Sequence, residues 1–275
     1  MNPQQRPAGD ARGPRGPRPP HKGGGAGSRP PRGGGNGRRL RPPRNPHKHP
    51  MREGVMNRAH QDTIPPLADD AIRIIPLGGV EEIGRNMTAI EFRGEIIVVD
   101  CGFGFGENEN TPGVDYILPN TQYLEDNKDK IRALIISHGH LDHIGGIPYI
   151  IDGIGHPPIY TRKLTGMMIK KRQEEFSYLP APIIREVEGN ETVQIGSLKV
   201  CFFAVTHTIP DAMGIIIETP YGDVVVTGDI KLDHENTVVA ENEVREFETF
   251  KNRKSLMLLM DSTNVDRPGW SIPER

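Results

Sequence analysis

Short apolar segments, separated by glycine, proline and charged residues, recur along the chain between residues 71 and 260. Most are rich in isoleucine and valine and too short for helices, which is typical of buried β-strands. The expected strands cover residues 71–76, 87–92, 95–99, 131–136, 157–160, two pieces within 193–205, then 215–219, 223–226 and 255–260. Pro220-Tyr221-Gly222 predicts a hairpin between two of them.

Helical patterns lie between these strands. Residues 121–130 and 162–176 are expected to be helical, and a further helix opens at Asp142 and His143 and continues over 144–151, whereas 103–118 has an irregular pattern. Gly145-Gly146 in that helix would let backbone or a ligand come close. The alternation of strands and helices predicts an α/β fold built in layers.

Polar residues follow four of the expected strands directly at their carboxyl ends. They are His138 after 131–136, His207 after the strand ending at 205, Asp229 after 223–226 and Asp261 after 255–260. Because functional sites of layered α/β proteins gather at one edge of a sheet, we expect these side chains to converge there.

The charge distribution divides the chain into two unlike parts. Residues 1–60 contain fourteen Lys or Arg against two acidic residues, and the remainder contains 20 basic and 34 acidic residues. The first part also has twelve Pro and twelve Gly and little that is apolar, so residues 1–68 are expected to form a disordered basic arm. Arginines such as Arg38, Arg39 and Arg41 could neutralise RNA phosphates without reading sequence, since the arm lacks aromatic residues. A solubilising tail, or one that masks the acidic body, is the alternative.

Targeting signals and cysteines indicate a compartment. The amino terminus lacks the apolar stretch of a secretory signal, and no apolar run approaches the roughly 20 residues that span a bilayer. Cys101 and Cys201 are too few for a disulfide framework and are expected to be buried free thiols. A cytoplasmic protein without a membrane segment is therefore expected.

Potential metal ligands are most concentrated in the sequence His138-Gly-His140-Leu-Asp142-His143, which places three imidazoles and a carboxylate in six residues. Imidazole nitrogens and carboxylate oxygens are the ligands that zinc accepts. The pair His138 and His140 could bind one metal ion, and the pair Asp142 and His143, which extends to a different position, could bind a second. The alternative is a polar loop with chance histidines.

Two later residues extend this candidate site. His207 follows a strand and precedes Pro210, which prevents a helix from continuing and fixes the loop. Asp229, preceded by Gly228, could bridge two cations through its two oxygens. At the end of 95–99, Asp100 could orient a metal-bound histidine through its second ring nitrogen, or could equally cap the next turn.

These motifs resemble those of the metallo-β-lactamase superfamily, in order and in spacing. Four segments are similar in sequence to the ribonuclease J family, which belongs to the β-CASP branch of this superfamily. They are residues 77–87 (LGGVEEIGRNM), 100–103 (DCGF), 227–231 (TGDIK) and 261–264 (DSTN). The resemblance implies an αβ/βα sandwich with two Zn²⁺, or Mn²⁺. His138, His140 and His207 would hold one metal, Asp142 and His143 the other, Asp229 would bridge, and Asp142 would also orient the attacking water.

The same resemblance implies a ribonuclease that cleaves RNA phosphodiester bonds 5′-to-3′ as an exonuclease, and also as an endonuclease, in messenger and ribosomal RNA processing and decay. It implies a dimer or tetramer of the full-length enzyme and contact with other RNA-degradation proteins. Residues 69–265 would be the amino-terminal part of an incomplete lactamase domain and 266–275 the start of a β-CASP insertion. The chain is thus expected to be the amino-terminal piece of a longer enzyme, or a truncated gene product. In the family, the later part of the chain supplies a further histidine ligand.

Two other functions remain open at this stage. A hydrolase of the same superfamily that acts on a small thioester or lactam would share the metal site but would need no arginine-rich arm. An inactive, truncated fold that binds RNA only through residues 1–60 would lose all RNA binding when that arm is deleted.

Overall fold

A computed structural model describes residues 64–106 and 113–272 of the chain. Residues 1–63 of the expected basic arm, and residues 273–275 of the expected insertion, lie outside the described residues. In the described part, no helix has both the length and the apolar character that crossing a membrane requires.

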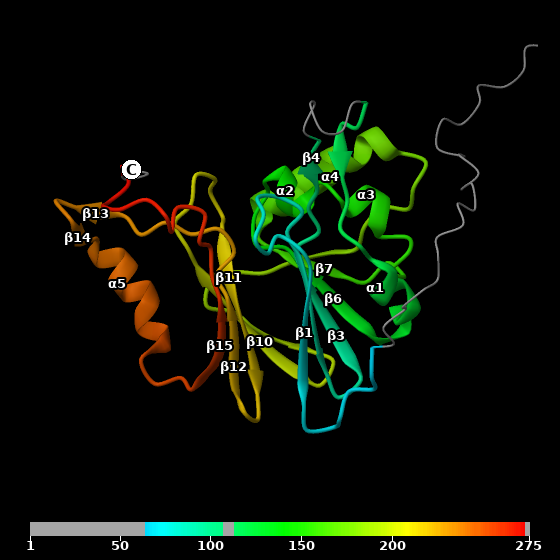
Figure 1. Ribbon diagram of the computed structural model, residues 1–275, viewed down its shortest axis with the longest axis horizontal. Helices are drawn as coiled ribbons and strands as arrows, with labels where there is room; N and C mark the ends of the chain where they lie inside the picture. The colour runs from blue at the N-terminus through cyan, green and yellow to red at the C-terminus, as the bar shows by residue number, and fades with distance from the viewer. Residues whose placement is uncertain (1–63, 107–112, 273–275) are drawn as a thin grey trace, which may run out of the picture. The chain divides into compact units, whose positions relative to one another are not determined.

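Two β-sheets carry the fold (Figure 1). The first sheet has the order β1-β2-β3-β6-β7-β8. Its strands are β1 (Ile72–Gly78), β2 (Met87–Phe92), β3 (Glu95–Val99), β6 (Ile131–Ile135), β7 (Ile159–Thr161) and β8 (Ile184–Glu186). From β3 to β8 the neighbours are parallel, so the carboxyl ends of β3 and β6 meet at one edge.

The second sheet has the order β15-β12-β11-β10-β9. Its strands are β9 (Thr192–Ile195), β10 (Leu198–Ala204), β11 (Met213–Thr219), β12 (Gly222–Val226) and β15 (Ser255–Leu259). β11 is antiparallel to both β10 and β12, and β15 is parallel to β12. The carboxyl ends of β10, β12 and β15 therefore share one edge, and the predicted hairpin is confirmed as β11–β12.

Helices and short strands complete the described part. The helices are α1 (Gln122–Asp126), α2 (Leu141–Ile144), α3 (Ile147–Ile150), α4 (Lys163–Gln173) and α5 (Glu241–Phe247), with 3₁₀ turns at Lys128–Lys130, Glu174–Phe176 and Glu248–Phe250. Two small ribbons pair β4 (Gly104–Phe105) with β5 (Tyr116–Ile117), and β13 (His234–Glu235) with β14 (Val238–Val239).

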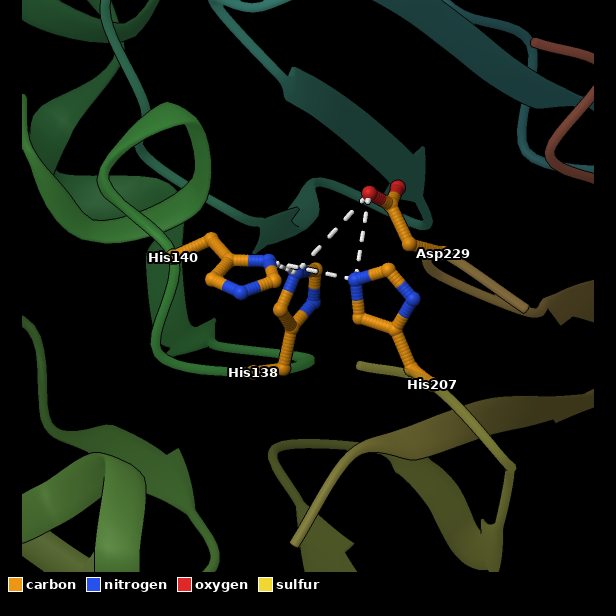
Figure 2. A group of neighbouring side chains, drawn as sticks. All are labelled: His138, His140, His207 and Asp229. Carbon is orange, nitrogen blue, oxygen red and sulfur yellow. Dashed lines mark hydrogen bonds and ion pairs between the residues drawn. The ribbon is translucent and has the colours of Figure 1, made fainter. Parts of the chain in front are cut away.

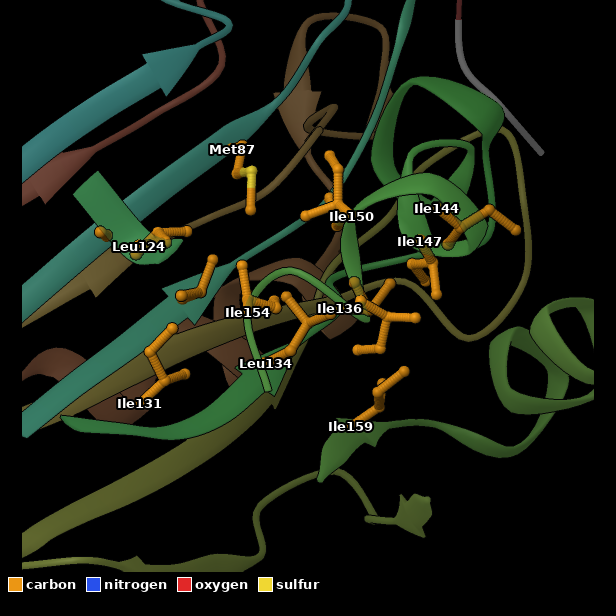
Figure 3. Packing of buried hydrophobic residues seen from close by; sticks show 14 of the residues in the cluster. Met87, Leu124, Ile131, Leu134, Ile136, Ile144, Ile147, Ile150, Ile154 and Ile159 are labelled. Carbon is orange, nitrogen blue, oxygen red and sulfur yellow. The ribbon is translucent and has the colours of Figure 1, made fainter. Parts of the chain in front are cut away.

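Three apolar layers hold these elements together. One lies between the first sheet and α1 to α4 and contains Leu134 and Ile147 (Figure 3). Ile169 of α4 belongs to the same cluster. The second lies between the two sheets, where Ile97 and Ile215 are fully buried. A smaller cluster joins the second sheet to α5 and the turn that follows it. The order of layers is helices, sheet, sheet, helix, which is the predicted αβ/βα sandwich.

Several local predictions were wrong in detail. The helix expected over 144–151 is divided into α2 and α3, because Gly145-Gly146 turns there and packs against the β3–β4 connection. An added Cβ on Gly146 would lie within 2.9 Å of the carbonyl oxygens of Cys101 and Gly102. Of the two possibilities predicted for this glycine pair, a close approach of backbone or of a ligand, the structure shows the approach of backbone. The 121–130 helix breaks at Asn127, and the irregular stretch contains the β4–β5 ribbon. Strands β8, β13 and β14 and helix α5 were not predicted.

A candidate metal centre between the two sheets

The four polar groups predicted to converge come from two facing sheets and not from one. His138 follows β6 of the first sheet, and His207, Asp229 and Asp261 follow β10, β12 and β15 of the second. A backbone hydrogen bond from the Met213 N–H to the Ser137 carbonyl, 3.0 Å long, joins the two edges beside the site. The ligands therefore meet where the two sheets face each other at their carboxyl ends.

Three histidines and one aspartate form the first group (Figure 2). His140 Nδ1 lies 3.0 Å from His138 Nε2 and 3.1 Å from His207 Nε2. The Asp229 Oδ2 atom lies 3.9 Å from His138 Nε2 and 3.6 Å from His207 Nε2. All four residues thus point a nitrogen or an oxygen at one small volume.

These distances fit a bound cation better than hydrogen bonds among the rings. One Nδ1 lone pair cannot accept from two imidazoles at once, yet His140 Nδ1 is within hydrogen-bond distance of both neighbours. Ligand atoms about 2.0–2.1 Å from a tetrahedral zinc ion are about 3.3 Å apart. The donor set, three imidazoles and one carboxylate, is also one that zinc accepts.

The second group contains Asp142, His143 and Asp229. His143 Nε2 lies 3.3 Å from Asp229 Oδ1 and 3.5 Å from Asp142 Oδ2. Asp142 and His143 belong to the first turn of α2, directly after the loop that carries His138 and His140. Since Asp229 turns one oxygen to each group, the structure brings the predicted ligands together as two adjacent sets that share this residue.

Asp100 lies behind both groups at the end of β3. Its Oδ2 atom is 2.8 Å from His143 Nδ1, and its Oδ1 atom accepts the Ser137 N–H at 2.8 Å. The Ser137 hydroxyl donates to Oδ2 at 2.9 Å and lies 3.0 Å from His138 Nδ1. Through this network, Asp100 contacts His143 directly and His138 by way of Ser137. The backbone of Asp100 is left-handed, with φ of 60°, a conformation that Asp and Asn tolerate.

Burial and charge set the protonation of these residues. Burial lowers the pKa of His138 to about 2, and the charge of His143 adds to the effect, so the ring is neutral and keeps one nitrogen lone pair for a cation. Burial opposes the charge on His143, but the Asp100 charge and hydrogen bond, with bonds to Asp142 and Asp229, raise its pKa well above the usual range. Burial would raise the pKa of Asp229, yet hydrogen bonding to His143 and its charge lower it to about 2.

Sequence reasoning missed two residues of this centre. Ser137 links Asp100 to His138, and Asn86 Nδ2 lies 3.2 Å from Asp142 Oδ2. Asn86 belongs to the segment 77–87 that carries the family resemblance, but nothing in the pattern of that segment selected this residue. Ser137 directly precedes the histidine motif, and this adjacency was the one available signal.

A pocket of about 600 Å³ opens over the second group. Its walls are the loop of residues 78–84 and the segment of residues 259–266 after β15. Glu81, Glu82, Asp261 and Asp266 line it together with Asp142 and Asp229. This acidic lining would repel a polyanion unless cations offset the charge.

The comparisons with known proteins agree with this architecture. Residues 80–260 match the family model of the metallo-beta-lactamase superfamily, and the chain belongs to that superfamily. A crystal structure described as a protein of unknown function from Enterococcus faecalis V583 has a similar fold, with a TM-score of 0.50 and 20% identity over 72% of this chain and 52% of that one.

Within the superfamily, the predicted resemblance to ribonuclease J is confirmed. The chain is 38% identical over 211 residues to ribonuclease J of Thermus thermophilus, which covers 74% of this chain and 37% of the relative. It is 36% identical over 203 residues to ribonuclease J2 of Bacillus subtilis, covering 74% of this chain and 36% of the relative. The chain therefore spans little more than a third of the length of these relatives.

Proposed function

We propose that this chain carries the metal centre of a metal-dependent ribonuclease that hydrolyses RNA phosphodiester bonds. The observation that carries the proposal is the pair of ligand groups that share Asp229, in a chain similar to ribonuclease J. The first metal would be held by His138, His140 and His207, and the second by Asp142 and His143, with Asp229 between them. Zn²⁺ suits the imidazole-rich first group, and Mn²⁺ is the alternative where carboxylates dominate.

Asp142 and Asp100 have different proposed roles at this centre. When bound, two divalent cations would offset charge on a phosphodiester and make water a stronger nucleophile at neutral pH. The Asp142 side chain is 29% exposed and lines the pocket, so its carboxylate is placed to orient an attacking water. Asp100 would hold His143 in the tautomer with a free Nε2.

The proposed whole enzyme acts 5′-to-3′ as an exonuclease and also as an endonuclease in RNA processing and decay. RNA is its substrate, and Arg38, Arg39 and Arg41 of the expected basic arm would contact phosphates without sequence preference. Residues 69–265 and 266–275 keep their expected roles as lactamase domain and start of an insertion. The whole enzyme is proposed to be a cytoplasmic homo-oligomer that associates with other RNA-degradation proteins.

Metal content and RNA cleavage, measured on the same preparations, test the proposal. Wild type should bind about two metals per chain by elemental analysis. Both His140→Ala and Asp142→Ala should lose metal and lower cleavage of a 5′-monophosphorylated RNA by about 100-fold or more. His156→Ala is a matched control, because His156 contacts Asp152 and lies outside both ligand groups.

Three results would contradict the proposal. Normal metal content in His140→Ala would show that the ligand assignment is wrong. Two bound metals with cleavage of a lactam or thioester, and none of RNA, would favour the other hydrolase. RNA binding that disappears when residues 1–60 are deleted, without metal or cleavage in wild type, would indicate an inactive RNA-binding fragment.

A further inference from the structure

We propose that Asn86 is a positioning residue for the second metal, acting through Asp142 and His143. The inference rests on the proposed function, because it concerns one of the two ligand groups described there. Asn86 lies between the loop of residues 78–84 and β2, and its side chain is only partly exposed.

The backbone of Asn86 links the first turn of α2 to the β3–β4 connection. Its N–H donates to the Asp142 carbonyl at 3.1 Å, and its own carbonyl accepts the Gly102 N–H at 3.0 Å. Gly102 packs so closely here that an added Cβ would lie 1.5 Å from the Asp142 carbonyl oxygen. The position of Asn86 relative to Asp142 is thus fixed by main-chain contacts on both sides.

The side-chain amide adds three contacts to the second group. Asn86 Nδ2 lies 3.2 Å from the Asp142 carbonyl oxygen, 3.2 Å from Asp142 Oδ2 and 3.0 Å from His143 Nε2. Two of these neighbours are oxygens that can only accept from it, which requires the NH₂ group and not the amide oxygen to face them. Asn86 therefore donates to Asp142, and its NH₂ group lies beside the ring nitrogen of His143 that would bind the second metal.

The loop before Asn86 makes room for this arrangement. An added Cβ on Gly79 would lie 2.5 Å from Asn86 Oδ1, and one on Gly78 would lie 2.3 Å from the Arg85 carbonyl oxygen. Gly79 also has a positive φ of 84°, which favours glycine. The two glycines thus let the loop close over the amide oxygen while its nitrogen faces the ligands.

The contacts of Asn86 distinguish the two ligand groups. The hydrogen-bond partners of its side chain are Asp142 and His143, and both belong to the second group. The hydrogen bonds from Asn86 to Asp142 can persist when a cation takes the His143 Nε2 lone pair. Hydrogen bonds to ligating carboxylates orient them, and their loss typically costs 10- to 100-fold in metal affinity.

Titration of the metal-free full chain with Co²⁺, followed by visible absorption and by competition with a chelator, tests the inference. Asn86→Ala should weaken the second Co²⁺ by about 10- to 100-fold and change the first by less than about threefold. Asn120→Ala is a matched control, because Asn120 is exposed and its side chain only accepts the Gln122 N–H. Asn86→Ser, whose hydroxyl can still donate one hydrogen bond, should fall between wild type and Asn86→Ala, and it replaces that variant if Asn86→Ala does not fold.

Equal weakening of both cobalt sites, or an unchanged second site, would overturn the inference. If wild type binds two Co²⁺ ions and both Asn86 variants bind them with the same affinities, the role of Asn86 is refuted but the two-metal centre is not. Wild type that binds fewer than two would refute the two-metal centre as well. Metal binding is read here without RNA, so the result does not depend on cleavage.

Discussion

Replacing Asp100 by asparagine should weaken the second metal site selectively. The substitution keeps the shape of the side chain, and asparagine tolerates the left-handed backbone of residue 100. It replaces one carboxylate oxygen by an NH₂ group. The Ser137 N–H can still be accepted by the remaining oxygen, so the NH₂ group faces His143 Nδ1, which now has to accept. It also faces the Ser137 hydroxyl, which loses its acceptor.

A bound metal requires neutral His143 with its hydrogen on Nδ1, and the substitution favours the opposite tautomer. With Nδ1 as acceptor, the neutral ring carries its hydrogen on Nε2, the nitrogen that faces Asp142 and Asp229. A cation then has to force the ring back to the other tautomer and break its hydrogen bond. A hydrogen bond to a charged group contributes about 1.5 to 3 kcal/mol. Since about 1.4 kcal/mol is tenfold in affinity, the second site should lose about 10- to 100-fold.

The assay is Zn²⁺ competition with a chelator on the metal-free chain, with thermal unfolding recorded in parallel. The first site should weaken less, because Asp100 reaches His138 only through Ser137. Asp223→Asn is a control, since Asp223 is a buried carboxylate that pairs with Arg253 at the opposite end of β12. An Asp100→Asn variant with wild-type affinity for both metals would refute the orienting role of Asp100. A larger loss at the first site would show that the network acts mainly through Ser137.

Other predictions follow from the same contacts. Ser137→Ala should weaken the first metal by about tenfold in the same assay, because the fully buried His138 loses the acceptor of its Nδ1 hydrogen; an unaffected first site would contradict this. Because the pKa of His143 is raised, a second cation must displace its proton, so second-site affinity should rise about tenfold per pH unit until that pKa is passed. A pH-independent second site between about pH 6 and pH 8 would refute that linkage. Gly102→Ala should lower the free energy of unfolding by about 1–3 kcal/mol, whereas Gly189→Ala, with open space around it, should change it little in denaturant titrations.

Local sequence information was enough for the strands and for most of the candidate ligands. The expected strands 87–92 and 95–99 coincide with β2 and β3, because runs of apolar residues between turn residues specify a buried strand without reference to distant contacts. His138, His140, Asp142 and His143 occupy one short segment, so their proximity is also local. The strand ends predicted that His207 and Asp229 converge with His138, and the family resemblance supplied the division of the ligands between two metals.

What the sequence did not reveal depends on long-range contacts. Division into two sheets follows from the parallel pairing of β12 with β15 and of β3 with β6, which no single segment encodes. Asn86 contacts Asp142, a residue 56 positions later, and its own neighbourhood contains no periodic pattern that marks it. The split of α2 from α3 likewise reflects packing of Gly145-Gly146 against the β3–β4 connection.

Apolar packing between the sheets fixes the distances within the candidate metal centre. His138 and His140 are carried by the first sheet, whereas His207 and Asp229 are carried by the second, so a cation in the first group would link the two layers. The buried residues between the sheets and the backbone bond from Met213 to Ser137 hold these edges together without any cation. The fold therefore brings the ligand atoms close together before a metal binds, and metal binding in turn stabilises the folded state because the unfolded chain lacks the assembled site.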